Sequence, residues 1–183
     1  MKKILVPLAK GLEEIEAISI IDILRRGDIE VVTVGLDSVE ILGSHNIKII
    51  ADTMLEKVSA DSFDGIVLPG GMPGSLSLKK NAKILSIIQK YNQEGKLVGA
   101  ICAAPMVLEE AGILDDRMFT IHPATIPNIT LKPENQQVVE DGNIITGQAS
   151  GAATLFGLTL VKYLQNHDKM LSVNKGMLYN LII

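Results

Sequence analysis

Residues 96–108 read KLVGAICAAPMVL, and the pattern of this stretch is the starting point for predicting the fold. The uncharged run at 97–101 suits a β-strand and leads directly into Cys102, the only cysteine of the chain. A helix-compatible run follows, with Pro105 where the first turn of a helix tolerates proline. The stretch therefore predicts a strand, a turn at the cysteine and a helix.

Small residues flank this cysteine on both sides. Ala100 lies two positions before Cys102 and Ala104 two positions after it. The spacing predicts a nucleophile elbow, a sharp strand-to-helix turn that bulky neighbours would obstruct. An elbow would expose the sulfur and point helix N–H groups at it, which can lower a thiol pKa from about 8.5 to roughly 3.5–7.5. A lone cysteine is more commonly a small buried apolar residue, so the flanking alanines carry this hypothesis.

The composition indicates a folded globular domain. Apolar residues make up 47% of the chain and charged residues 21%, and the net charge of −4 with no basic block argues against nucleic acid as a main partner. Only six uncharged residues follow Lys3, too few for a signal peptide, and the uncharged run at 143–161 contains Gln148 and glycines, unlike a membrane span. One cysteine excludes an internal disulfide and a cysteine-rich zinc site. We expect a cytoplasmic protein with one domain over 1–183.

Apolar strands and amphipathic helices alternate along the chain. Strands are predicted at 3–8, 30–35, 63–68 and 97–101, with hairpins over 39–51 and 136–146. Helices are predicted at 12–26, 81–94, from the elbow to about 112, at 151–164 with Ser150 as N-cap, and at 168–181, while 119–128 reads as irregular. This order predicts an α/β fold, a doubly wound, flavodoxin-like, mostly parallel sheet with helices on both faces.

Glu16 is unlike its acidic neighbours because it lies on the apolar stripe of the first helix with Leu12, Ile20 and Ile23. A buried carboxyl needs a partner or a proton, whereas a place at the edge of the stripe would let it reach water. The helix follows the first strand, and ligands bind at the carboxyl ends of strands in such sheets. Burial and a nearby Cys102 thiolate would both raise the pKa of Glu16, and the protonated carboxyl could hydrogen-bond to the sulfur.

Two adjacent glycines, Gly70 and Gly71, follow the predicted strand at 63–68. Such a pair lets the backbone approach a ligand and presents unhindered N–H groups. Many Gly-Gly pairs are simple turns. The sequence has neither of the glycine motifs that bind nucleotides.

Four segments together resemble one family: GLEEIE at 11–16, LRR at 24–26, LPGGMPG at 68–74 and AICAAP at 100–105. This combination resembles the ThiJ/PfpI superfamily, with its domain of the class I glutamine amidotransferase type. Within it, the sequence is similar to the branch of the YajL and parkinsonism-associated DJ-one protein deglycases. The resemblance runs over essentially the whole chain and includes TGQ at 146–148.

The resemblance implies a set of site residues. Cys102 takes the place of the family's reactive, oxidisable cysteine, and Glu16 that of the protonated glutamate that hydrogen-bonds to it. The backbone N–H groups of Gly71 and Ala103 match the oxyanion-binding groups, with Gly70 beside them. Arg26 matches an arginine near the dimer interface. Members of the family are typically cytoplasmic homodimers without a metal or organic cofactor, so the resemblance implies the same here, and no membrane or specific nucleic-acid partner is expected.

The histidines depart from the family pattern. Protease-like members carry histidine where Ala103 stands, so a peptidase triad is not expected. The histidine of the deglycase branch corresponds to a position near Ile129. His122 is the nearest alternative, although it is equally well read as a loop residue before a proline. His45 and His167 have no motif context.

The resemblance implies a cysteine-dependent enzyme of the glyoxalase or deglycase type, acting on methylglyoxal, glyoxal or their glycated adducts. The alternative is an oxidative-stress sensor or redox-regulated chaperone, in which Cys102 is oxidised to sulfinic acid. Both use the same thiol, so the sequence leaves both open. An amidotransferase-like or thiazole-biosynthetic role lacks its Cys/His constellation and phosphate loop.

Overall fold

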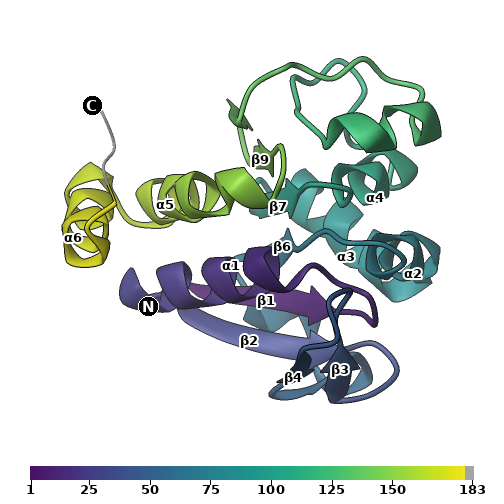
Figure 1. Cartoon of the computed structure of the whole chain (residues 1–183), viewed down its shortest axis with the longest axis horizontal. Helices are drawn as coiled ribbons and strands as arrows, with labels where there is room; N and C mark the ends of the chain where they lie inside the picture. The colour runs from purple at the N-terminus through teal and green to yellow at the C-terminus, as the bar shows by residue number, and fades with distance from the viewer. Residues whose placement is uncertain (180–183) are drawn as a thin grey trace.

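Seven strands form one sheet with the order β5-β2-β1-β6-β7-β9-β8 in the computed structural model, which describes residues 1–179 (Figure 1). All neighbouring strands are parallel except β8, which runs antiparallel to β9. The strands are β1 (Lys3–Leu8), β2 (Glu30–Gly35), β5 (Thr53–Met54), β6 (Gly65–Leu68), β7 (Leu97–Ile101), β8 (Val138–Asp141) and β9 (Ile144–Gly147). The predicted flavodoxin-like, mostly parallel sheet is therefore confirmed.

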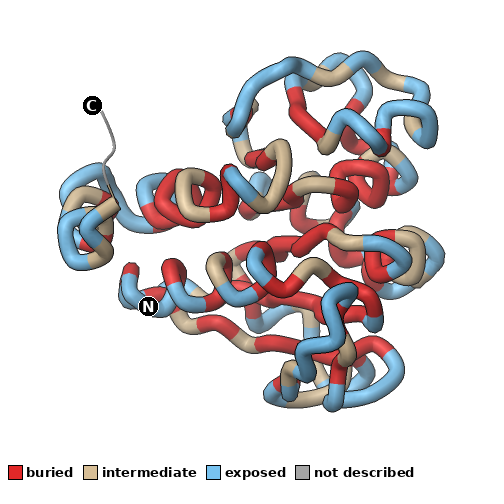
Figure 2. Tube along the Cα trace, viewed as in Figure 1, coloured by how far each residue is buried: buried red, intermediate tan, exposed pale blue. Residues whose placement is uncertain are grey.

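Helices cover both faces of this sheet, and each face has its own apolar core. One core contains residues of three helices, α1 (Glu14–Arg26), α5 (Ala153–Leu164) and α6 (His167–Met177). The other core contains residues of α3 (Ala82–Gln93) and α4 (Pro105–Glu110), together with Leu78 of α2 (Gly74–Lys80). Strand β1 serves both, since Ile4 and Val6 face the first core and Leu5 the second. Burial on two faces explains why the strand is apolar throughout rather than alternating (Figure 2).

The remaining elements are short. Strands β3 (Glu40–Leu42) and β4 (Lys48–Ile50) form the predicted hairpin as a separate two-stranded sheet. The sequence does not predict four short elements: helix α2, strand β5 and the 3-10 helices Leu55–Lys57 and Ala60–Ser62. Segments of two to seven residues carry too little periodicity to be recognised. No helix within residues 1–179 is long and apolar enough to cross a membrane.

Two helix boundaries differ from expectation. Ser150 was predicted to cap the last long helix, but it begins a 3-10 turn, Ser150–Ala152, and neither this turn nor α5 has a side-chain cap. Helix α6 begins at His167 because the Asn166 side chain accepts the Lys169 N–H at 2.8 Å. The last predicted helical residues, 180–181, lie outside the described part of the chain. The predicted irregular segment contains a 3-10 helix, Pro123–Asn128.

The topology places three loops side by side. Strands β1, β6 and β7 are adjacent and parallel, so their carboxyl ends lie on the same edge of the sheet. The loop after β1 leads to Glu16, the loop after β6 contains Gly70 and Gly71, and Cys102 directly follows β7. Segments far apart in the sequence therefore meet at one place, as expected for this class of fold.

Candidate active site

Cys102 occupies the predicted nucleophile elbow. Its φ is +62°, which is uncommon for a residue other than glycine and is found preferentially at functional sites. The backbone is fixed on both sides: the Cys102 N–H donates to the Gly147 carbonyl and the His122 N–H donates to the Cys102 carbonyl, both at 2.9 Å. Ala100 and Ala104 are fully buried, which explains the need for small residues there. The thiol itself is half-buried and unbonded to another cysteine.

Glu16 is fully buried, so the alternative of a water-exposed helix edge is excluded. Its Oε2 accepts the N–H of Gly70 at 2.8 Å. Its Oε1 is also buried and accepts no hydrogen bond from the described residues, which makes this oxygen the natural position for a proton. The carboxyl and Cys102 both lie against Gly70: a Cβ on that glycine would lie 2.6 Å from Glu16 Oε2 and 2.7 Å from the Cys102 Cβ.

The Pro-Gly-Gly loop is held against both of these residues. The Gly70 carbonyl accepts the N–H of Glu13 at 3.0 Å, and Gly71 adopts a φ of +94°. A Cβ on Gly71 would lie 2.2 Å from the Glu13 nitrogen, so only glycine fits. Because the N–H of Gly70 donates to Glu16, it positions that carboxyl, whereas the N–H groups of Gly71 and Ala103 lower the pKa of the Cys102 thiol.

The pKa values of Glu16 and Cys102 depend on each other. The pKa of Glu16 is raised from 4.5 to about 7, because burial, together with the smaller effect of the Glu13 charge, outweighs the hydrogen bonding that lowers it. The pKa of Cys102 is raised to about 12. Burial is the largest cause, and the charge and hydrogen bonding of the Glu16 carboxyl also raise this pKa, whereas the N–H groups of Ala103 and Gly71 lower it. The elbow and helix terminus are expected to lower the thiol pKa, but burial and the Glu16 carboxyl act in the opposite direction. Because both groups are buried against Gly70, the charge on one opposes ionisation of the other.

His122 is the histidine that the structure brings to the elbow. Its backbone donates to the Cys102 carbonyl, and its Nδ1 accepts the Ala124 N–H at 3.1 Å. The neutral ring therefore carries its proton on Nε2. Ile129 directly follows the same 3-10 helix and has no group that can transfer a proton.

Arg26 lies at the opposite end of α1 from Glu16. It is exposed, and its Nε donates to Asp22 Oδ2 at 2.6 Å. The structure therefore separates Arg26 from the thiol within one chain.

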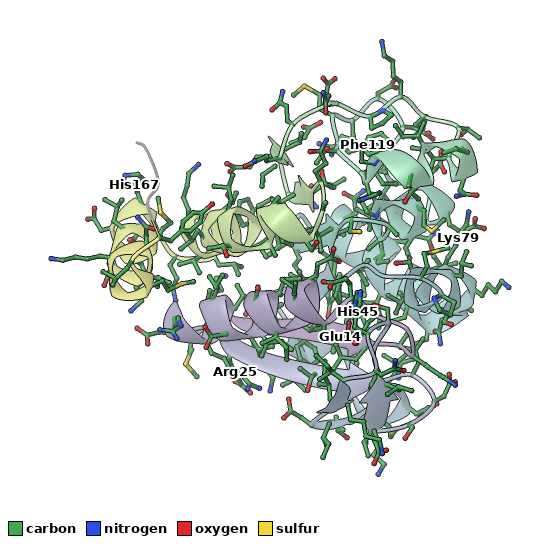
Figure 3. The ribbon with its side chains drawn as sticks, viewed as in Figure 1. Glu14, Arg25, His45, Lys79, Phe119 and His167 are labelled. Atoms are coloured by element: carbon green, nitrogen blue, oxygen red, sulfur yellow. The ribbon has the colours of Figure 1, made fainter. Side chains whose placement is uncertain are left out.

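Glu14 and His45 form a contact that the sequence did not indicate (Figure 3). The buried Glu14 carboxylate accepts from the His45 N–H at 2.7 Å, the Ile47 N–H at 3.3 Å and the Ser44 hydroxyl at 3.2 Å, and its Oε2 lies 3.0 Å from His45 Nδ1. Burial opposes ionisation of Glu14, but these hydrogen bonds outweigh it and lower its pKa to about 2. Glu13, Glu14 and His45 are the described groups that come close enough to bind a metal. Because donors already occupy both Glu14 oxygens, we interpret the group as an anchor for the β3–β4 hairpin.

We expect Gly70→Ala to reduce both stability and activity. The new Cβ would lie 2.6 Å from Glu16 Oε2, 2.7 Å from the Cys102 Cβ and 2.7 Å from the Ile101 carbonyl oxygen. The collision should cost about 2–4 kcal/mol of unfolding free energy. Displacement of the pair should slow any reaction at the thiol at least about tenfold. Thermal unfolding and iodoacetamide alkylation of Cys102 measure the two effects.

The matched control is Gly176→Ala in α6, where a new Cβ meets nothing within 4 Å. This substitution should leave alkylation unchanged and stabilise the helix by up to about 1 kcal/mol. Equal behaviour of the two variants would contradict the close packing of Gly70 against the pair.

The protein is a doubly wound α/β domain with a cysteine at the elbow after a central strand and a buried glutamate at the same site. These features define a class of cysteine-centred proteins. The chain belongs to the DJ-1/PfpI family, whose model matches residues 2–163.

Relatives of known name lie in the DJ-1 branch. Protein dj-1beta of Drosophila melanogaster is 36% identical over 181 residues, which cover 97% of each chain. A Caenorhabditis elegans relative named glutathione-independent glyoxalase DJR-1.2 is 33% identical, over 90% of this chain and 89% of its own. Protein DJ-1 homolog A of Arabidopsis thaliana is 38% identical over 96% of this chain, but the chain spans only 46% of that protein.

Solved structures agree with these relationships. The structure of oxidized Toxoplasma gondii DJ-1 superposes with a TM-score of 0.94 at 32% identity, covering 99% of this chain and 100% of that one. The structure of Drosophila melanogaster DJ-1beta also gives 0.94, at 35% identity, covering 98% and 99%. The predicted membership of this superfamily and branch is confirmed.

Proposed function

We propose that this protein is a cofactor-independent enzyme that converts small 2-oxoaldehydes, such as methylglyoxal or glyoxal, through a covalent adduct on Cys102. The observation that supports this most strongly is that Cys102, at a nucleophile elbow with a φ of +62°, and the fully buried Glu16 carboxyl lie against the same glycine, Gly70. The similarity to a relative named glutathione-independent glyoxalase supports this substrate class. Glycated adducts of the same aldehydes are a second group of candidate substrates.

The first step is addition of the thiolate to the aldehyde carbon. The new S–C bond forms as the carbonyl π electrons move to oxygen, and the Gly71 and Ala103 N–H groups stabilise the resulting oxyanion. Glu16 donates its proton to that oxygen, which gives a hemithioacetal. The site therefore needs Cys102 ionised and Glu16 protonated at the start.

The second step moves a proton within the adduct. The Glu16 carboxylate removes the hydrogen of the former aldehyde carbon and returns it to the neighbouring carbonyl carbon. The hydroxyl proton of the hemithioacetal moves to the neighbouring oxygen through the enediol, which gives a thioester of a 2-hydroxy acid. Water then cleaves the thioester, releasing the acid and restoring the thiol. One aldehyde and one water give one 2-hydroxy acid, so no outside oxidant or reductant is needed. His122, whose backbone N–H donates to the Cys102 carbonyl, is the candidate for a second proton donor.

Kinetics on several 2-oxoaldehydes and on their amino-acid adducts would test this proposal. We expect 2-hydroxy acid to accumulate at the rate at which the aldehyde disappears. Turnover of adducts with release of the free amine would favour the deglycase form of the activity. Aldehyde loss equal to that of a Cys102→Ala sample would contradict the proposal, because the protein would then act only as a scavenger.

The alternative role as a redox sensor or redox-regulated chaperone uses the same thiol. It is favoured by a half-buried, unpaired Cys102 beside two N–H donors that could hold sulfinate oxygens. Mild peroxide should then add two oxygens to Cys102 before it oxidises methionines. Mass spectrometry that finds oxidised methionine beside an unmodified Cys102 would contradict this role.

We also propose that the protein is a homodimer, as the position of Arg26 in the family pattern suggests. Ile15 and Ile18 of α1 are 59% and 49% exposed, and a second copy could bury these apolar side chains. Light scattering at micromolar concentration should give twice the chain mass of 19.7 kDa. The mass of a single chain would refute the dimer.

A further inference from the structure

The segment 123–133 directly follows His122, whose backbone N–H donates to the Cys102 carbonyl at 2.9 Å. It contains the 3-10 helix Pro123–Asn128 and lies beside α4, in the green part of the ribbon (Figure 1). The hydrogen bonds of a 3-10 turn have poorer geometry than those of an α-helix. The segment therefore needs contacts from outside to hold one position next to the elbow.

Glu109 of α4 supplies such contacts. Its Oε1 accepts the Thr130 N–H at 2.7 Å, the Thr130 hydroxyl at 2.8 Å and the Leu131 N–H at 3.1 Å. Among residues 1–179, no other hydrogen bond links the segment 123–133 to a part of the chain outside residues 119–134. One carboxylate oxygen therefore makes all the hydrogen bonds that tie this segment to a helix.

The Glu109 carboxylate is a strong acceptor in a half-buried position. Burial opposes its ionisation, but the hydrogen bonds from Thr130 and Leu131, with a smaller effect of the Lys79 charge, lower its pKa below the usual value. Lys79 of α2 itself pairs with the neighbouring Glu110 at 3.2 Å. Hydrogen bonds to a charged acceptor are stronger than those to a neutral one, so Glu109 can fix the backbone that it contacts.

The position of Glu109 does not favour its own helix. It lies in the last turn of α4, where a negative charge is unfavourable to the helix dipole. The same short helix begins at Pro105, shortly after Cys102. One end of α4 therefore follows the elbow, and the other end holds a segment whose neighbour His122 bonds back to the elbow.

Apolar packing is the other contact that holds this segment. Ile129 and Leu131 are half-buried and pack against the apolar core that contains residues of α3 and α4. Burial of apolar surface is non-directional, so this packing can keep the segment near α4 without fixing its backbone. The hydrogen bonds to Glu109 supply that direction.

We propose that Glu109 is a positioning residue, which fixes the segment 123–133 on α4 and thereby keeps the His122 N–H on the Cys102 carbonyl. Its catalytic consequence rests on the proposed function, in which His122 is the candidate for a second proton donor. The order of the segment is a property of the free protein, and it can be measured without any substrate.

Two variants of Glu109 and one of its neighbour separate anchoring from helix formation. Glu109→Ala removes the acceptor, whereas Glu109→Gln keeps an uncharged oxygen in its place. Alanine and glutamine both favour helices, so α4 should form in each. Glu110→Ala is the matched control, because Glu110 is the next residue of the same helix, is exposed and pairs with Lys79 rather than with the segment.

The measurement is amide hydrogen exchange of the full chain, followed by NMR. In Glu109→Ala, the N–H groups of Thr130 and Leu131 should exchange at least about tenfold faster, because they lose bonds to a charged group. The His122 N–H should exchange about three- to tenfold faster, because the segment next to it opens more often. Glu109→Gln should lie between the parent and Glu109→Ala, and Glu110→Ala should match the parent.

Kinetics give a readout that a purely structural role would not change. Glu109→Ala should lower kcat for methylglyoxal about tenfold, because His122 is less well positioned. KM should stay within about twofold of the parent, and Glu109→Gln should restore part of kcat. A lower melting temperature with an unchanged kcat would mean that Glu109 serves stability alone.

Three exchange results would overturn the inference. Unchanged exchange at Thr130 and Leu131 would mean that apolar packing alone holds the segment. Faster exchange there with an unchanged His122 N–H would mean that Glu109 does not act on the elbow. Equal effects of Glu110→Ala and Glu109→Ala would mean that loss of any charge at the end of α4 is sufficient.

The same data separate this inference from the proposed function. Faster exchange at His122 in Glu109→Ala, with no turnover of a 2-oxoaldehyde by the parent, would leave the role of Glu109 standing while the proposed function fails. Turnover by the parent with unchanged exchange in Glu109→Ala would refute the role of Glu109 and leave the proposed function standing.

Discussion

Cys102→Ala should abolish turnover of methylglyoxal, with a loss of at least about a thousandfold in kcat/KM. The proposed mechanism has no other nucleophile: the adduct forms on the sulfur, and Cys102 is the only cysteine in the sequence. The methyl group of alanine occupies the same elbow, so the fold should be retained. Production of 2-hydroxy acid is the readout, with thermal unfolding as the check on folding.

Cys102→Ser is the matched variant, because it keeps an oxygen nucleophile in the same position. A hydroxyl is a far weaker acid than a thiol, so this variant should be nearly as inactive as alanine. Activity of the alanine variant at the parent level would mean that the reaction does not take place on Cys102. A lowered melting temperature of both variants would show that the substitutions affect folding.

Replacement of Glu16 should distinguish hydrogen bonding from proton transfer. Glu16→Gln keeps a donor toward the sulfur but cannot move a proton, whereas Glu16→Leu has neither ability. We expect Gln to preserve iodoacetamide alkylation of Cys102 largely, and to lower turnover by about 10²–10⁴-fold. Leu should lower turnover as much and also raise the pH at which alkylation begins, because the thiolate loses its donor. Parent-like behaviour of both variants would remove Glu16 from the site.

The same residue makes stability depend on pH. The pKa of Glu16 is raised from 4.5 to about 7, so the folded state holds this proton more tightly than the unfolded chain. The stabilisation is therefore fully present below pH 4.5 and is lost as pH rises through about 7. Relative to Glu16→Gln, the parent should lose up to about 3 kcal/mol of unfolding free energy over that range. Denaturant unfolding at pH 4.5 and pH 8 measures the difference, and equal changes in both proteins would argue against a buried, protonated Glu16.

The fold class and the elbow could be predicted from the amino-acid sequence alone, which left the burial of Glu16 as one of two alternatives. Each depends on local pattern. The continuous apolar run of β1 requires a sheet covered on both faces, and Ala100 and Ala104 permit the sharp turn at Cys102. The stripe that Glu16 shares with Leu12, Ile20 and Ile23 is a helical repeat that must face a core. Such patterns persist because each residue is restricted by its own neighbours in the chain.

The contacts between the elbow, the Pro-Gly-Gly loop and the first helix could be seen only in the tertiary structure. Three hydrogen bonds join segments that are at least 20 residues apart. They link Gly70 to Glu16, His122 to Cys102, and His45 to Glu14. The electrostatics also depended on packing: burial and the Glu16 carboxyl raise the thiol pKa that the helix terminus was expected to lower. A pKa reflects the solvation and charges around a group in space, and spacing along the chain does not fix either. The sequence therefore identified the two acids, and the structure showed that both lie against Gly70.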